Sequence, residues 1–193
     1  MKGTKDALKD FLEDIDSDEV LFILTASKVE EYTQYVSDAK DTFKDLGINI
    51  NELDISDIDR EIALEKIDDC KIIYFSGGNS FYLLQELERL DLINLLREKV
   101  QNGMIYVGES AGAIIASENI EYSQEMDDKE KAKNLIDYKG LSLIDFYIVP
   151  HFKEMPFTEL ADAIIDQYSD KIKLVPINNK EAIIVIDDVV EKE

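Results

Sequence analysis

The sequence predicts an α/β fold, a three-layer sandwich in which helices cover both faces of a mostly parallel sheet. Short apolar runs, such as Val-Leu-Phe-Ile-Leu-Thr at residues 20–25, alternate along the chain with longer amphipathic segments. A strand buried on both faces gives a continuous apolar run, whereas a helix repeats its apolar residues every three or four positions. Regular alternation of the two patterns is typical of parallel strands connected by helices.

The first part of the chain is predicted to contain three helices and three strands. A helix is expected over residues 6–15, where the apolar side chains share one face. A second helix, over residues 30–46, ends at Gly47, because glycine readily adopts the left-handed conformation that closes a helix. An acidic cap begins a third helix at residues 57–67. Apolar runs predict the strands, at residues 20–25, 48–53 and 71–75.

The remainder is predicted to continue the same alternation. Helical periodicity covers residues 81–87, 91–101 and 157–168. Apolar runs predict strands at residues 104–107, 146–149, 174–177 and 182–186, the last being the expected final strand. Residues 118–133 are polar and acidic, so they are expected to form an excursion away from the sheet.

The composition narrows the classes of function. No Pro/Gly/Ser-rich linker divides the 193 residues, so one domain over residues 1–193 is expected. The formal net charge of −22 opposes binding to nucleic acid or to an anionic membrane. A single cysteine, Cys70, forms no internal disulfide, and the chain has no apolar leader or spanning segment, so a cytoplasmic protein is expected. One histidine makes a metal cluster unexpected.

Residues 108–113, Gly-Glu-Ser-Ala-Gly-Ala, carry the strongest functional signal. They follow a predicted strand and lead directly into a helix-compatible segment. Gly-x-Ser-x-Gly at such a turn is the nucleophile-elbow pattern, in which the glycines relieve crowding and the serine hydroxyl stands exposed. We therefore interpret Ser110 as a nucleophile. The alternative is a serine that only caps the helix.

Two further strand ends supply partners for Ser110. His151, the only histidine, directly follows a predicted strand, and an imidazole can shuttle protons near neutral pH. Gly77 and Gly78 follow another strand, and we expect the N–H groups of Gly78 and Ala111 to hold an oxyanion. Because the carboxyl ends of parallel strands meet at one edge of a sheet, these junctions should converge. A structural histidine and an ordinary glycine turn are the alternatives.

At these motifs the sequence resembles the dipeptidase E-like serine peptidases, whose fold is the class I glutamine amidotransferase-like, flavodoxin-like sandwich. The matching elements are Gly77-Gly78-Asn79 followed by Phe81-Tyr82-Leu83-Leu84, the hexapeptide at residues 108–113, Pro150-His151, and residues 20–31. The resemblance implies a serine peptidase acting on short peptides, with Ser110 as nucleophile, His151 as base and Gly78 in the oxyanion hole. It implies neither a metal nor an organic cofactor.

The chain departs from this family at its start. Family members usually begin with a short strand that ends in a Thr-Ser-Ser-like turn, before the first helix. This chain opens directly with the helix at residues 6–15, so the first strand is expected to be missing. An unfilled position in the sheet favours dimerisation or strand exchange. A monomer or a homodimer is expected.

The group that orients His151 is a second departure. Some family members place a carboxylate before the final strand, where this chain has Asn178-Asn179-Lys180-Glu181. By its position Asn179 takes this role, and Glu181 is the nearby carboxylate. An amide can orient an imidazole, but it stabilises the imidazolium less than a carboxylate does.

Four further residues are candidates for binding substrate: Asn79, Glu109, Lys153 and Asp127. Asp127 lies where some relatives carry a functionally important Asp, although a solvated surface acid is an equal alternative. Recognition of an N-terminal aspartate calls for a fixed cation, preferably arginine. The three arginines lie on predicted helices away from the junctions, and Lys153 is the one nearby cation. Strict aspartyl specificity is therefore not expected.

The sequence thus predicts a serine peptidase or amidohydrolase that forms an acyl-enzyme. A non-catalytic protein that binds a peptide or small molecule is the alternative, favoured by the missing strand and by the absent carboxylate. An α/β-hydrolase esterase fits poorly, because in that fold the histidine follows the late acid near the C-terminus. Neither a cofactor nor a metal is expected.

Overall fold

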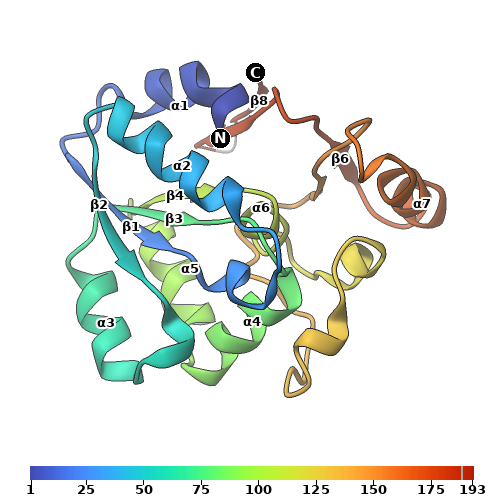
Figure 1. Cartoon of the computed structure of the whole chain (residues 1–193), viewed down its shortest axis with the longest axis horizontal. Coiled ribbons are helices and arrows are strands. Elements are labelled where there is room, and N and C mark those ends of the chain that lie inside the picture. Colours follow the sequence, from blue (N-terminus) through green and yellow to red (C-terminus); the bar gives the residue numbers. More distant parts are fainter. Residues whose placement is uncertain (188) are drawn as a thin grey trace.

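A parallel four-stranded sheet forms the centre of the computed structural model, which describes residues 1–187 and 189–193. The strand order is β2-β1-β3-β4. These strands are β1 (Glu19–Ile23), β2 (Asn49–Leu53), β3 (Ile72–Phe75) and β4 (Ile105–Gly108). Helices α1 (Lys5–Leu12) and α2 (Gln34–Asp45) cover one face, and α3 (Arg60–Asp68), α4 (Ser80–Arg89) and α5 (Ile93–Gln101) cover the other (Figure 1). The predicted α/β sandwich is confirmed.

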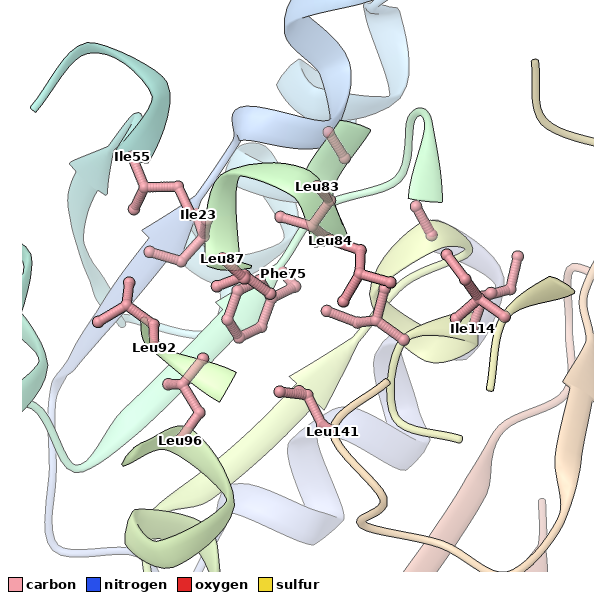
Figure 2. Close-up of a cluster of buried hydrophobic side chains, with 14 of the residues drawn as sticks. Ile23, Ile55, Phe75, Leu83, Leu84, Leu87, Leu92, Leu96, Ile114 and Leu141 are labelled. Atoms are coloured by element: carbon pink, nitrogen blue, oxygen red, sulfur yellow. The ribbon is translucent and has the colours of Figure 1, made fainter. Parts of the chain in front are cut away.

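Alternate residues of the inner strands feed two separate cores. Phe22 and Tyr74 pack on the side of α1 and α2. Ile23 and Phe75 pack on the opposite side, where Figure 2 shows Phe75 beside Leu87 of α4. Side chains of a strand alternate between its two faces, so burial of both faces requires apolar residues at every position. This explains the continuous apolar runs of β1 and β3.

Smaller elements complete the chain. Short 3₁₀ turns are η1 (Lys2–Thr4), η2 (Thr25–Val29), η3 (Ile55–Asp57), η4 (Glu121–Glu125) and η5 (Lys129–Lys131). The short helix α6 (Ala111–Ile114) follows β4, and α7 (Thr158–Tyr168) lies between β5 (Tyr147–Val149) and β6 (Leu174–Pro176). Strands β5 and β6 pair in parallel. No helix of the described ranges has both the length and the apolar character needed to cross a membrane.

The chain ends in an antiparallel hairpin that the sequence predicted only in part. Strand β7 (Ile183–Ile186) was expected, but β8 (Val189–Lys192) follows it, so residues 182–186 are not the final strand. Every residue of β8 is exposed, and half of them are charged. A strand with no buried face has neither a continuous nor an alternating apolar pattern, so β8 could not be predicted from periodicity.

The sheet is interrupted beside β4. One edge of β4 pairs with β3, and within residues 1–187 and 189–193 no strand pairs with the other edge. All four β4 residues are half-buried, whereas those of β3 are fully buried. The start of the chain lies near this open edge, because the Met1 amine forms an ion pair with Glu109. The β5–β6 pair therefore forms a sheet separate from β4.

Candidate active site

A sharp turn places Ser110 between β4 and α6. Its backbone has a φ of +50° and a ψ of −105°, a conformation that L-amino acids rarely adopt. A methyl group on Gly108 would lie 2.5 Å from the carbonyl oxygen of Gly112, and one on Gly112 would lie 2.4 Å from the carbonyl oxygen of Phe75. Both positions therefore require glycine. The Gly-x-Ser-x-Gly pattern is explained by close backbone approach around a strained serine.

The side chains of three distant residues form one hydrogen-bonded series. The Ser110 Oγ atom lies 2.9 Å from Nε2 of His151, and Nδ1 of the same ring lies 2.7 Å from Oδ1 of Asn179. Because an amide oxygen can only accept, Nδ1 carries the proton and Nε2 is left to accept from the serine hydroxyl. This is the tautomer that a general base needs. The structure brings all three predicted residues together.

The Glu181 carboxylate does not bond to the imidazole. Its Oε2 atom accepts the N–H of Asn178 at 2.9 Å, and its Oε1 atom pairs with the Lys192 ammonium at 3.0 Å. The N–H of Asn178 and then Lys192 lower the pKa of Glu181. Glu181 therefore stays ionised and holds the turn that presents Asn179.

The turn between β3 and α4 lies directly against the elbow. A methyl group built on Gly77 would lie 3.4 Å from the Ser110 Cβ atom. Gly78 has a φ of +132°, and a methyl group there would meet the carbonyl oxygen of Ala26 at 2.2 Å. In the described part of the chain, the N–H groups of Gly78 and Ala111 donate to no protein acceptor. Two free donors beside a serine hydroxyl are the elements that an oxyanion hole requires.

Asn79 is part of the same turn, but the fold uses both ends of its amide. Its Oδ1 atom accepts the N–H of Tyr82 at 2.9 Å, and its Nδ2 atom donates to the carbonyl oxygen of Asp128 at 3.0 Å. Asn79 is buried and caps helix α4. It thereby fixes the start of that helix next to the Gly77-Gly78 turn.

Glu109 and Lys153 make contacts with residues other than Ser110 and His151. The Glu109 carboxylate accepts a hydrogen bond from the Tyr74 hydroxyl and forms an ion pair with the Met1 amine. The Lys153 ammonium lies 4.9 Å from the centre of the Phe152 ring, and its side chain is exposed. Among the described contacts, neither side chain bonds to Ser110 or to His151.

Asp127 lies at the start of α4 rather than on the open surface. Its Oδ2 atom accepts the N–H of Ser80 at 2.9 Å. Burial raises the pKa of Asp127 to about 6, although the hydrogen bonds from Ser80 act in the opposite direction. Its neighbours Tyr122 and Ser123 are buried, so the acidic excursion is packed against the fold in part. Asp127 is therefore half-buried and is hydrogen-bonded to the start of α4.

The raised pKa predicts a pH dependence of stability. An aspartate of the unfolded chain titrates near pH 3.9, so the folded protein holds this proton more tightly and ionised Asp127 weakens the fold at neutral pH. The free energy of unfolding of Asp127→Asn should therefore rise relative to that of the parent as the pH increases. The difference between the two proteins should grow by about 1–3 kcal/mol from pH 4 to pH 7. Urea unfolding at several pH values measures this difference. A difference that stays constant over the range would contradict the prediction.

Two aromatic residues of the site gave no signal in the sequence. The Phe157 ring stacks on the His151 imidazole, with ring centres 4.6 Å apart and planes at 23°. The Tyr35 ring lies against Gly77, since a methyl group built on this glycine would be 3.5 Å from the ring. The Tyr35 hydroxyl is buried and has no hydrogen-bond partner among the described residues. Burial, then the carboxylates of Glu30 and Glu109, raises the pKa of Tyr35. Both aromatics lie in or beside predicted helices, where such residues ordinarily belong to the core.

Comparisons with known proteins identify the family of this chain. The model of peptidase family S51 matches residues 1–192. An uncharacterized peptidase of Pasteurella multocida is 45% identical over 180 residues, which cover 93% of this chain and 87% of that protein. A peptidase E of Haemophilus influenzae is 32% identical over 145 residues, which cover 75% of this chain and 63% of that protein.

Solved structures give the same result. The crystal structure of a candidate peptidase E from Listeria monocytogenes superposes with a TM-score of 0.94 at 39% sequence identity. The match covers 100% of this chain and 93% of that one. The resemblance first seen in the serine, histidine and glycine motifs is thereby confirmed, and so is the fold that it implied. This chain belongs to peptidase family S51.

Proposed function

We propose that this protein is a serine peptidase that hydrolyses short peptides through an acyl-enzyme on Ser110. The series Ser110–His151–Asn179, with separations of 2.9 Å and 2.7 Å, is the observation that carries the proposal. Serine is a weak nucleophile at neutral pH, and a base within hydrogen-bonding distance activates it. Membership of a peptidase family supports an amide bond as the target.

The proposed reaction has two halves. In the first, Nε2 of His151 takes the hydroxyl proton while Oγ of Ser110 attacks the peptide carbonyl carbon, and the carbonyl oxygen becomes an oxyanion. The N–H groups of Gly78 and Ala111 stabilise that charge. The imidazolium then protonates the leaving amine, and the C–N bond breaks. In the second half, His151 takes a proton from water, the hydroxide attacks the ester, and Ser110 regains its proton as the acid leaves.

Asn179 has an orienting role in this scheme. Its amide oxygen accepts from Nδ1 of His151 and so keeps Nε2 facing the serine. The amide is neutral, so it offers the imidazolium a dipole and no full countercharge. We therefore propose a triad of Ser110, His151 and Asn179 in place of one that ends in a carboxylate.

A strict preference for an acidic substrate residue is not part of the proposal. Each arginine is engaged elsewhere: Arg60 with Asp91, Arg89 with Glu86, and Arg97 with the carbonyl oxygen of Leu141. Lys153 is exposed and lies over Phe152. A fixed arginine is the usual partner of a recognised carboxylate. We expect neutral N-terminal residues to be cleaved at least as well as aspartate.

Labelling with a fluorophosphonate tests the nucleophile. The reagent is expected to form one adduct, on Ser110, at a rate that falls by more than about 100-fold in His151→Ala. Ser142→Ala is a matched control, because this exposed serine also has a positive φ, +52°. Mass spectrometry locates the adduct. Absence of labelling at Ser110, or labelling that is independent of His151, would favour the alternative of a non-catalytic binding protein.

A further inference from the structure

The contact between Phe157 and His151 is built by two successive turns. The N–H of Glu154 donates to the carbonyl oxygen of His151 at 3.0 Å, and the N–H of Phe157 donates to the carbonyl oxygen of Glu154 at 2.8 Å. The chain thus folds back over itself, and the half-buried Phe157 ring covers one face of the imidazole at 4.6 Å. These backbone hydrogen bonds bring the two rings together.

The imidazole is otherwise short of negative charge. The two groups bonded to its nitrogens, Ser110 and Asn179, are both uncharged at neutral pH. Two acids close in sequence to Ser110 and Asn179 are paired with other groups. Glu181 pairs with Lys192, and Glu109 pairs with the Met1 amine.

Two charged residues follow His151 on its own segment. The Lys153 ammonium lies over the Phe152 ring, and Glu154 is joined to His151 through a bond between backbone groups. In the described part of the chain, neither side chain bonds to the imidazole. The imidazolium that forms during proton transfer therefore has no carboxylate bonded to it.

We propose that Phe157 is a positioning residue that stabilises the imidazolium of His151. The face of an aromatic ring carries partial negative charge and attracts a cation whose centre lies within about 6 Å. The stacked geometry directs this face at the imidazole, so Phe157 supplies part of the stabilisation that a carboxylate would give. The proposal rests on the proposed function only in assigning His151 a proton-transfer role.

The consequences for catalysis are specific. His151 becomes positively charged in both halves of the reaction, so loss of the aromatic face should slow acylation and deacylation alike. A general base is neutral before it accepts a proton, so the ground state does not depend on the contact in the same way. The expected signature of Phe157→Leu is therefore a fall in kcat of about 3- to 10-fold with little change in KM.

The first experiment titrates the imidazole directly by NMR, without substrate. The chain has one histidine, so its imidazole signals belong to His151 without further assignment. The titration midpoint is expected to move to lower pH by about half a unit to one unit in Phe157→Leu. Phe157→Tyr should keep the parent midpoint, and Phe157→Trp should keep or raise it. The aromatic variants test the proposal even if the leucine variant does not fold.

The second experiment measures kcat in two backgrounds. Asn179→Asp places a carboxylate on Nδ1, so the cost of Phe157→Leu should be smaller there than in the parent. A purely structural role predicts the same loss in both backgrounds. An unchanged titration midpoint in Phe157→Leu, or an equal shift in Phe157→Tyr, would overturn the proposal. Failure of fluorophosphonate labelling with a shifted midpoint would instead overturn the proposed function.

Discussion

Replacing Ser110 by alanine is expected to lower kcat for peptide hydrolysis by at least about 10⁴-fold. The substitution removes the only atom that can form the proposed ester, and the oxyanion donors alone leave a small residual rate. His151→Ala should cost a comparable factor, because the hydroxyl without its base is a weak nucleophile. The double variant should be no slower than either single variant, since the two residues act as one unit.

Initial-rate measurements on a panel of short peptides, with folding checked by circular dichroism, test this expectation. Ser142→Ala serves as the control and should keep the parent rate. Losses that multiply in the double variant would show that Ser110 and His151 act independently. A Ser110→Ala variant with unimpaired turnover would place the nucleophile elsewhere.

Gly78→Ala is expected to have the largest effect on the fold itself. The added methyl group would meet the carbonyl oxygen and carbon of Ala26 at 2.2 Å and 2.3 Å, and both are backbone atoms that cannot rotate aside. The φ of +132° adds strain for any residue with a Cβ atom. We expect a loss of roughly 3–5 kcal/mol in free energy of unfolding. Surviving protein should lose at least about 100-fold in kcat, because the Gly78 N–H is displaced.

Gly103→Ala is a control that has the backbone strain of a positive φ without a steric clash. Gly103 also has a positive φ, +101°, but nothing lies within 4 Å of the added methyl group. Its loss in free energy of unfolding should be only about 1–2 kcal/mol, with kcat unchanged. Urea unfolding and initial rates on both variants provide the comparison. Equal losses in free energy of unfolding at the two positions would contradict the prediction that the clash with Ala26 destabilises Gly78→Ala.

Much of the central sheet could be predicted from the sequence because burial on both faces leaves a strong pattern. Ile23 and Phe75 stand in continuous apolar runs, residues 20–24 and 72–75, whose side chains pack into one of the two cores. Ser110 and His151 do converge as predicted, and each follows a strand. However, β4 and β5 belong to separate sheets, so a shared sheet edge accounts for the proximity of Ser110 to Gly78 and not for that of His151. These predictions depend on the spacing of apolar residues and on the order of strands and helices, both of which can be seen directly in the sequence.

The remaining features depend on long-range geometry. Asp127 stands in an acidic stretch, and only the packing of that stretch against α4 buries its carboxyl group. The stacking of Phe157 on His151 depends on a backbone that turns through positive φ values at His151 and Lys153, +60° and +61°. Neither residue is glycine, so the sequence gives no sign of these conformations. Asn179 was placed by resemblance to a family and not by any pattern of its own.

The break in the sheet has a mechanical consequence for catalysis. Ser110 follows the four-stranded sheet, whereas His151 follows the β5–β6 pair, and no described backbone ladder joins the two. Side-chain packing holds them in register instead: Ala111 and Ile114 of α6 share a core cluster with Val149 of β5, and the Tyr122 hydroxyl donates to Ile148. Contacts of this kind yield more readily than a strand ladder does. The distance between Ser110 and His151 therefore depends on how closely the β5–β6 pair packs against α6 and the four-stranded sheet.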